Sequence, residues 1–324
     1  MQEVKYYQDI INKELRSIHF PNKPTDLYEP IEYLLNIGGK RIRSCLTLLS
    51  AEMFDCEIPK ALPTAIAVEV FHNFSLMHDD IMDKAPLRRG QKTVHEKWGT
   101  NTAILSGDYM LIQSYQFIVK NDPSVLPALM DVFNQTAAEV CMGQQLDMDF
   151  EKSEDVKIAD YIEMIKLKTA VLIGAALQMG AIVAKAHNQS TQLLYEYGVN
   201  LGIAFQLQDD FLDVFGNAEK FGKQIGGDIL ENKKTYLLLK ALELAQEQDR
   251  TEILTWLSKK EFHPEEKIAA IVNIYNKLDV QHYIKQEMKQ YTDRAFAALY
   301  EIKIHEKKKE PLRKLAEALL YRSQ

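Results

Sequence analysis

Apolar residues recur at helical spacing along almost the whole chain of 324 residues. Between Pro63 and Asp83 they return at steps of three and four residues, and Pro63 is placed to lie in the first helical turn. No alternation of period two persists over the length of a strand, and only 14 glycines and 10 prolines are present. Because the tight turns of a β fold need these two residue types, the pattern predicts an all-α fold.

No segment of the sequence marks a boundary between domains. A linker rich in Pro, Gly or Ser is absent, and so is any low-complexity tract. We therefore predict a single domain over residues 1–324, a bundle of about ten or more helices around a central cavity. Two segments, 63–78 and 198–212, are apolar almost all round, which is typical of helices in the middle of a bundle.

The charge of the chain limits its partners. With 39 Lys and Arg against 46 Asp and Glu, the net charge is −7, which offers no basic footprint for nucleic acid. The first 15 residues, MQEVKYYQDIINKEL, lack the apolar core of a secretion signal. No apolar run approaches the ~18 residues that cross a bilayer. We expect a cytoplasmic protein without a transmembrane segment or a nucleic-acid partner.

An acidic cluster ends the first apolar helix, in the order Asp79-Asp80-Ile81-Met82-Asp83. Asp79 and Asp83 are four residues apart, so they share one helix face. Like charges at this spacing cost a few tenths of a kcal/mol, and negative charge is unfavourable at a helix C-terminus. A bound cation would reverse both effects, although a solvated helix end is an equally good explanation of one such cluster.

The same pattern returns at the end of the second apolar helix, as Asp209-Asp210-Phe211-Leu212-Asp213. Two copies on two core helices are much less expected by chance than one. Mg²⁺ prefers carboxylate oxygens, retained waters and phosphate oxygens. Two clusters that face each other would hold several Mg²⁺ ions with a diphosphate between them. An acidic protein could act on anionic substrates in this way, because its carboxylates recruit positive charge as metal.

Basic residues flank both acidic clusters. Glycines let backbone amides approach an anion, and arginine grips phosphate oxygens with two donors at once. Each basic pair alone is weak evidence, since such residues usually solvate a surface. His72 precedes Asp79 by about two turns and reads as a core histidine unless the Lys40/Arg43 site lies nearby. The flanking groups are Gly38-Gly39-Lys40-Arg41-Ile42-Arg43, Arg88-Arg89-Gly90, Lys168-Thr169, Lys223, Gly226-Gly227-Asp228 and Lys233-Lys234-Thr235.

With these residues in this order, the chain resembles the trans-isoprenyl diphosphate synthases, or polyprenyl synthetases, and most closely the short-chain geranylgeranyl and farnesyl types. Ser44 departs from the pattern, because the family commonly has proline there. The resemblance implies the all-α isoprenoid synthase fold, a homodimer, and condensation of isopentenyl diphosphate with an allylic diphosphate (dimethylallyl, geranyl or farnesyl). The segments that carry it are GGKRIR (38–43), HDDIMD (78–83), RRG (88–90), MGQQLD (142–147), KT (168–169), FQLQDDFLD (205–213) and GKQIGGDILENKKT (222–235).

The resemblance also implies a role for each matching residue. Asp79 and Asp83 would bind two Mg²⁺ and Asp209 a third, so that three ions hold the allylic diphosphate. No His or Glu stands out as a base, so the released diphosphate is expected to take the proton. Arg88, Lys168, Lys233 and Lys223 would neutralise the allylic diphosphate; Lys40, Arg43, His72 and Arg89 would hold that of isopentenyl diphosphate; Thr169 and Gln206 would line the allylic cation, with Asp210 among the substrate-binding residues.

Product length is expected to depend on the helix before Asp79. A helix rises 5.4 Å per turn, so Ser75, Phe74 and Phe71 would meet the growing chain in that order. Phe74 stands at the depth where long-chain members of the family have a small residue, while Ser75 is small rather than aromatic. By this resemblance we expect a C20 product rather than C15. The other interpretation is that Phe71 and Phe74 are plain core residues.

Three other functions fit parts of the sequence. A class I terpene synthase ionises the same substrate but usually carries one D-D-x-x-D motif, and here the second motif, Asp209–Asp213, is intact. A non-catalytic subunit of a heteromeric synthase usually has broken aspartate motifs. A carboxylate-bridged di-iron bundle needs two E-x-x-H motifs, whereas Glu69-Val70-Phe71-His72 supplies one. The sequence does not identify the preferred primer or the downstream pathway.

Overall fold

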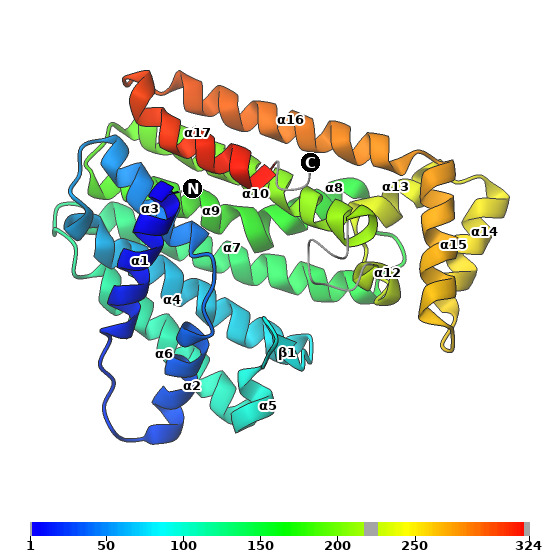
Figure 1. Ribbon diagram of the computed structural model, residues 1–324, viewed down its shortest axis with the longest axis horizontal. Helices are drawn as coiled ribbons and strands as arrows, with labels where there is room; N and C mark the ends of the chain where they lie inside the picture. Colours follow the sequence, from blue (N-terminus) through cyan, green and yellow to red (C-terminus); the bar gives the residue numbers. More distant parts are fainter. Residues whose placement is uncertain (1, 217–225, 321–324) are drawn as a thin grey trace. The chain divides into compact units, whose positions relative to one another are not determined.

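The computed structural model describes residues 2–216 and 226–320, and almost all of them are helical (Figure 1). This confirms the predicted all-α fold. The helices in chain order are α1 (Gln2–Arg16), α2 (Thr25–Asn36), α3 (Ile42–Met53), α4 (Ile58–Met82), α5 (Val94–Trp98), α6 (Thr100–Ile118), α7 (Leu126–Lys152), α8 (Ile158–Ile165), the π-helical turn η1 (Lys166–Ala170), α9 (Val171–Val183), α10 (Asn188–Phe215), α12 (Gly227–Leu230), α13 (Tyr236–Leu244), α14 (Glu247–Ser258), α15 (Pro264–Lys277), α16 (Val280–Glu301) and α17 (Glu306–Leu320).

One short antiparallel hairpin interrupts the helices in the described part of the chain. Strands β1 (Leu87–Arg88) and β2 (Gln91–Lys92) pair directly after the first acidic motif. The two residues between them, Arg89 and Gly90, have φ angles of 52° and 75°. Two positive φ angles in a two-residue turn match the twist of antiparallel strands. The expectation of no sheet was therefore wrong here, because strands of two residues are too short to show alternation.

The chain forms two compact units, each assembled from three separate stretches. The first unit comprises Met1–Thr136, Leu172–Tyr195 and Glu301–Leu315. The second comprises Ala137–Val171, Glu196–Tyr300 and Ala316–Gln324. The stretches alternate between the two units along the chain, so neither unit is a continuous piece of sequence. A single domain over residues 1–324, with a central cavity, stays a prediction.

Helix α4 is the centre of the first unit, packed against α3 and α6 (Figure 1). Four successive residues, from Ala65 to Val68, are fully buried, so this helix is covered on all sides. That confirms its expected place in the middle of a helical core. Its start was predicted wrongly. The helix begins at Ile58 with Pro59 in its first turn, and Pro63 lies inside it. Pro59 suits a first turn equally well.

In the second unit the acidic motif lies on α10, whose buried residues include Leu201, Ala204 and Leu207. The helix continues to Phe215, so Asp209–Asp213 occupies its last turns and does not end it. Helix α14 packs against α15 in the same unit. Its apolar residues are few: among them Ile253 is buried and Leu254 is exposed.

The segment Ile158–Val183 is long and apolar enough to cross a membrane, judged by length and composition alone. This differs from the expectation that no apolar run approaches that length. Of its most apolar window, 72% is buried inside the protein. A core helix meets the same criterion, and the burial is consistent with a soluble protein.

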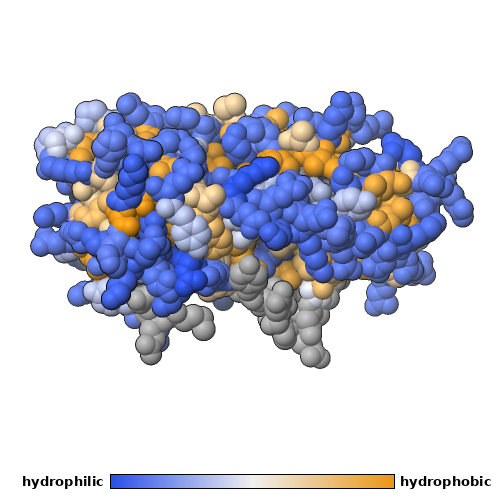
Figure 2. Space-filling model, turned by 90° about the horizontal axis from the view of Figure 1, so that it is seen from above, coloured by the Kyte–Doolittle hydropathy of each residue, from blue (hydrophilic) through white to orange (hydrophobic). Residues whose placement is uncertain are grey.

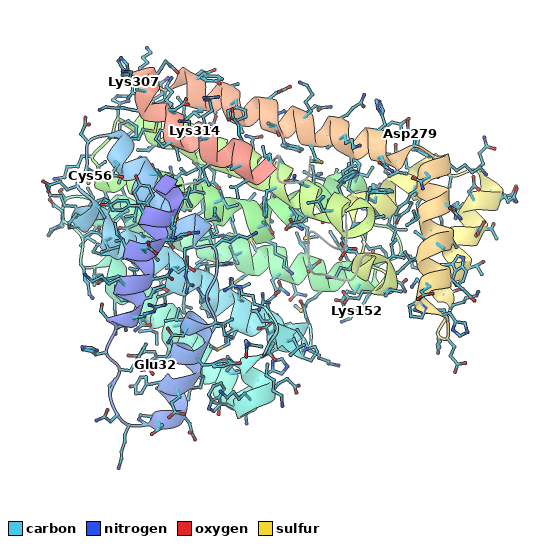
Figure 3. All side chains as sticks on the ribbon, viewed as in Figure 1. Glu32, Cys56, Lys152, Asp279, Lys307 and Lys314 are labelled. Atoms are coloured by element: carbon cyan, nitrogen blue, oxygen red, sulfur yellow. The ribbon has the colours of Figure 1, made fainter. Side chains whose placement is uncertain are left out.

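Charged residues lie mainly on the surface. On the face shown in Figure 2, hydrophilic residues predominate and apolar ones lie in small groups between them. Glu32, Lys152 and Lys307 are among the exposed charged side chains labelled in Figure 3. Buried and half-buried charged groups are the exceptions, because burial of a charge is costly unless a partner compensates for it.

Candidate active site

The three aspartates of the first motif have different surroundings, although they lie within five residues. Asp83 is the C-cap of α4, and its backbone N–H donates to the carbonyl of Asp79 at 2.9 Å. The Asp79 side chain is 19% exposed and Asp83 is exposed. Asp80 is buried, at 2%. The outer two carboxylates therefore reach solvent, and the middle one does not.

Arg88 on strand β1 explains the burial of Asp80. Its Nε lies 2.9 Å from both carboxylate oxygens of Asp80, and Nη2 lies 2.7 Å from Oδ1. The same Nη2 is 3.5 Å from Asp79 Oδ2. Burial raises the pKa of Asp80, while the hydrogen bonds and charge of Arg88 oppose that rise. The hairpin thus holds a guanidinium beside the first motif.

A second group of cations in the same unit gathers around His72. Nη1 of Arg43 lies 3.2 Å from His72 Nε2. Burial, followed by the charges of Arg43 and Arg89, holds the pKa of His72 well below its usual value. His72 is therefore neutral, and its Nε2 accepts a hydrogen bond from Arg43. The expected proximity of His72 to Arg43 is thus seen as a direct contact.

The GGKRIR segment and the hairpin meet at Gly39. Its φ is +152°, and a Cβ built there would come within 2.6 Å of Nη1 of Arg89. Only glycine lets the Arg89 guanidinium come this close. Arg43 Nε is buried and has no hydrogen-bond partner in the described structure, and burial lowers the Arg43 pKa to about 10. Guanidinium donors arranged in this way suit a phosphate group. Lys40, next to Gly39, is exposed.

The second motif also divides its three aspartates. Asp209 is exposed, whereas Asp210 is buried and accepts hydrogen bonds from Tyr161 Oη and, at 3.1 Å, from Gln206 Nε2. Burial raises the pKa of Asp210 to about 8, although these two donors oppose the rise. Asp213 Oδ2 accepts the backbone N–H of Asp228 at 3.0 Å. Asp213 therefore holds the start of α12.

The π-helical turn η1 carries the predicted Lys168 and Thr169. Lys168 Nζ lies 2.6 Å from Asp147 Oδ2 on α7. Thr169 Oγ1 donates to Gln206 Oε1 at 3.3 Å, and Gln206 in turn donates to Asp210. The π-turn thus carries two neighbouring contacts in the second unit: Lys168 pairs with Asp147, and Thr169 continues through Gln206 to Asp210. π-turns inside helices are frequent at functional sites.

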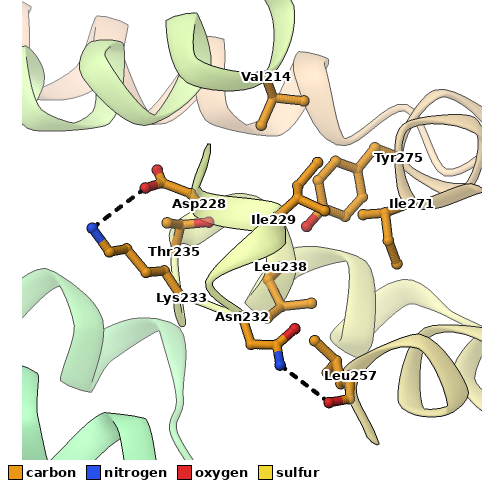
Figure 4. Close-up of a pocket in the computed structure, with 10 residues that line it drawn as sticks. All are labelled: Val214, Asp228, Ile229, Asn232, Lys233, Thr235, Leu238, Leu257, Ile271 and Tyr275. Carbon is orange, nitrogen blue, oxygen red and sulfur yellow. Dashed lines mark hydrogen bonds and ion pairs between the residues drawn. The ribbon is translucent and has the colours of Figure 1, made fainter. Parts of the chain in front are cut away.

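Lys233 follows α12 and lies 3.7 Å from Asp228 Oδ1 and 3.1 Å from Glu231 Oε2. Burial lowers its pKa, but the two carboxylates outweigh this, and the net pKa is raised. Figure 4 shows Lys233 and Asp228 at the edge of a small pocket. At about 10 Å³, the pocket has room for about one water molecule. It is too small for a substrate. Lys223 lies outside the described residues.

The residues proposed to set product length lie in the packed part of α4. Phe71 and Phe74 are 1% and 8% exposed, and their ring centroids are 5.5 Å apart. Phe71 also packs against Phe133 at 5.2 Å. Ser75 Oγ donates to the backbone carbonyl of His72 at 2.8 Å. This burial fits a core role and a plug alike, so the chain-length role stays a prediction.

No group of three or more His, Cys, Asp or Glu side chains among the described residues is arranged to hold a metal ion. A complete protein cage is not what Mg²⁺ requires, since it keeps waters and binds through one or two carboxylates plus substrate phosphates. Asp79 and Asp83 on one face of a helix end fit that donor set, and so does the exposed Asp209. The residues present therefore fit Mg²⁺ bound together with a diphosphate.

Several partners of the site residues were not predicted from the sequence. Asp147 ends the segment MGQQLD (142–147), so its membership of that motif is the sequence signal that could have identified it. Tyr161 sits two turns before Lys168 on an ordinary amphipathic helix and carries no such signal. Arg41 and Glu69 form a buried ion pair at 2.8 Å behind the GGKRIR segment.

Comparison with known proteins places these features in a family. The family model described as "Polyprenyl synthetase" matches residues 24–275. A geranylgeranyl diphosphate synthase of Saccharolobus solfataricus is 36% identical over 309 residues, 93% of this chain and 92% of that protein. The enzyme of the same name from Methanosarcina mazei is 39% identical over 245 residues, covering 75% and 76%.

Solved structures agree with the sequence comparison. A crystal structure of a geranylgeranyl pyrophosphate synthase has a TM-score of 0.94 at 45% identity and covers 99% of both chains. Another, from Corynebacterium glutamicum in complex with isoprenyl diphosphate and magnesium, has a TM-score of 0.83 at 28% identity, covering 99% of this chain and 97% of that one. The chain belongs to the polyprenyl synthetase family of prenyltransferases, the enzymes that build prenyl diphosphates.

Proposed function

We propose that this enzyme condenses isopentenyl diphosphate with an allylic diphosphate and releases a short-chain trans-prenyl diphosphate, C20 in preference to C15. One observation carries the proposal: both acidic motifs bury and pair their middle aspartate while the first aspartate keeps access to solvent. Such a division provides carboxylates for a metal on two separate helices. The relatives named geranylgeranyl diphosphate synthase support the C20 product.

Asp79 and Asp83 are proposed to bind two Mg²⁺ and Asp209 a third. The magnesium in the Corynebacterium glutamicum complex supports the choice of metal. When bound, these ions neutralise the charge that develops on the leaving diphosphate. Arg88, Lys168, Lys233 and Lys223 are proposed to add cationic donors to the same diphosphate, with Asp210 holding Gln206 in place at 3.1 Å.

Lys40, Arg43, His72 and Arg89 are proposed to hold isopentenyl diphosphate. The contact of Arg43 with His72 and the close approach of Arg89 to Gly39 support a common anion site. Thr169 and Gln206 would line the allylic cation, whose attack by the isopentenyl double bond forms the new C–C bond. The released diphosphate then takes the proton. A neutral His72 that already accepts a hydrogen bond from Arg43 is no free base, which favours this assignment.

Incubation with Mg²⁺, isopentenyl diphosphate and each of the C5, C10 and C15 primers, followed by sizing of the products, tests the proposal. The expected result is elongation that stops at C20. Absence of elongation with every primer contradicts it. A cyclic hydrocarbon formed without consumption of isopentenyl diphosphate identifies a terpene synthase instead. We also propose a cytoplasmic homodimer, which light scattering of the purified protein and cell fractionation would check.

A further inference from the structure

The GGKRIR segment contains a third basic residue, Arg41, whose side chain is buried at 4% exposure. All three of its nitrogens have a partner. Nη1 pairs with Glu69 Oε1 at 2.8 Å, Nη2 donates to the carbonyl of Leu35 at 2.5 Å, and Nε donates to Asn12 Oδ1 at 3.1 Å. Arg41 is thus fully occupied inside the protein, and it is not available to a diphosphate.

The backbone of Arg41 is equally constrained. Its φ and ψ are 49° and 32°, the left-handed region that residues with a Cβ rarely adopt, and it is the N-cap of α3. Such a conformation persists only where surrounding contacts hold it. Arg41 stands between Lys40 and Arg43, so this turn sets the direction in which the chain delivers both residues.

Glu69 is the centre of the contacts that hold the turn. It is 2% exposed and accepts hydrogen bonds from Arg41, from Ser44 Oγ and, at 3.2 Å, from Asn73 Nδ2. Ser44 is the residue that departs from the family pattern, and its hydroxyl is used here. A buried carboxylate needs this set of donors, because removal of one partner leaves an uncompensated charge.

Glu69 also connects the turn to His72. The two residues are three apart on α4, so they share one face of that helix. The Glu69 face thereby contacts the start of α3 through Arg41 and Ser44, while His72 contacts Arg43. Two successive turns on one face of α4 thus contact the same short segment.

We propose that Arg41 and Glu69 are positioning residues, which lock the segment 40–43 in the left-handed turn that presents Arg43 and Lys40 to the diphosphate of isopentenyl diphosphate. The inference rests on the proposed function, since it concerns one of the two substrates. A role limited to stability would affect both substrates alike, whereas positioning affects isopentenyl diphosphate alone.

Glu69→Gln tests this, because it keeps the shape and the acceptor oxygen but removes the charge. The expected result is a KM for isopentenyl diphosphate raised about tenfold or more, with kcat within about threefold and the KM of the allylic primer within about twofold. Ser44→Ala removes one hydrogen bond from the same carboxylate and should raise only the isopentenyl KM, by about threefold. It keeps the proposal testable if Glu69→Gln fails to fold.

Asp249→Asn is the matched control, because Asp249 is also a buried carboxylate in an ion pair, 2.7 Å from Lys277. It belongs to the second unit and to none of the motifs, so both KM values should stay unchanged. Equal changes in both KM values in Glu69→Gln, or an unchanged KM for isopentenyl diphosphate in both variants, overturn the proposal.

Calorimetric titration of isopentenyl diphosphate alone separates this inference from the proposed function. A wild type that binds isopentenyl diphosphate but elongates no primer contradicts prenyl transfer. The affinity ratio between wild type and Glu69→Gln still decides the positioning role, with about tenfold weaker binding expected and equal binding overturning it.

Discussion

Identical residues in the two acidic motifs have different structural tasks. Asp80 pairs with Arg88, Asp210 accepts from Tyr161 and Gln206, and Asp213 accepts the backbone N–H that starts α12. Residue type alone does not distinguish these roles, because an aspartate that binds a metal and one that caps a helix look the same in a sequence.

This division predicts unequal effects of the same substitution on α10. An Asn oxygen can still accept the N–H of Asp228, so Asp213→Asn should lower kcat by less than about tenfold. Asp209→Asn removes a proposed metal ligand and should lower kcat by about a hundredfold or more, since charge stabilisation is usually the largest catalytic term. Steady-state kinetics at saturating Mg²⁺ compares them. Equal losses would contradict the separate roles.

His72 predicts a pH dependence of stability. Its pKa in the folded protein is far below the ordinary 6.5, through burial and then the charges of Arg43, Arg89, Arg88 and Arg41. As the pH falls through about 6.5, His72 is therefore protonated in the unfolded chain but stays neutral in the folded protein. The contribution of His72 to the free energy of unfolding should fall by up to about 1.4 kcal/mol per pH unit as the pH drops below about 6.5.

Urea denaturation of the ligand-free protein between pH 7.5 and 5 measures that slope. His72→Gln keeps an acceptor for Arg43 but does not titrate, so its slope should be smaller by the contribution of one proton. Parallel curves for the two proteins would contradict the lowered pKa, because they would show that folding does not change the titration of His72.

Phe74 predicts a change in product length. Phe74→Ala removes a ring that packs against Phe71 and, at 4.8 Å, against His78. The product should lengthen beyond C20, and the variant should lose about 3–5 kcal/mol of stability, as buried Phe→Ala changes do. Phe74→Leu should lengthen it less. Chromatographic sizing of dephosphorylated products checks both variants. An unchanged product length in a folded Phe74→Ala variant would show that Phe74 does not set the chain length.

At the scale of elements, the tight contact between α7 and η1 depends on Gly143. A Cβ there would overlap the backbone of Lys168, whose Cα would lie at 2.6 Å. Gly143→Ala must push the π-turn away, and we expect a loss of about 1–3 kcal/mol, typical of overpacking, together with a lower kcat as Lys168 shifts. Met142→Ala, at the exposed neighbouring position, is the control. Wild-type kcat and stability in Gly143→Ala would contradict this packing role.

The helices that sequence periodicity predicts best are those with a long buried stripe. The apolar segment 198–212 lies wholly within α10, because tertiary burial imposes the period that the sequence shows. α14 shows no such stripe, and its first turn, from Glu247, is polar, so periodicity does not indicate it. The hairpin was missed because its turn chemistry, Arg89-Gly90, lacks the usual Asn-Gly or Asp-Gly signal.

At the scale of the whole molecule, the sequence predicts the charged residues of the candidate site, but it does not predict the residues that contact and orient them. The residues proposed to bind metal or substrate carry spacing constraints of their own, as in D-D-x-x-D. Their supports, such as Tyr161 for Asp210 and Glu69 for Arg41, come from elements far away in the chain. A tyrosine or glutamate in an apolar helix has many possible partners, and only the packed structure selects one.

Metal and diphosphate together should stabilise the folded protein more than either alone. A ligand that binds only the native state adds about 2.7 kcal/mol at a hundred times its Kd, which for a chain of 324 residues is a rise in Tm of a few degrees. At the proposed site, pyrophosphate alone would be repelled by the aspartates as well as attracted by the arginines, and Mg²⁺ alone finds no cage of three side chains among the described residues. Mg²⁺ would thus offset the charge of the aspartates for the diphosphate, and the diphosphate would add oxygen ligands for Mg²⁺.

Differential scanning fluorimetry with Mg²⁺, with pyrophosphate, with both, and with both plus excess EDTA measures this coupling without any turnover. We expect the full rise only with both components, its loss on chelation, and its loss in Asp79→Asn even at saturating Mg²⁺, because that variant keeps the arginines but removes one proposed metal ligand. Asp249→Asn should retain the rise. A rise with pyrophosphate that survives EDTA would show that the arginines bind the diphosphate by themselves, and the carboxylates would then need another function.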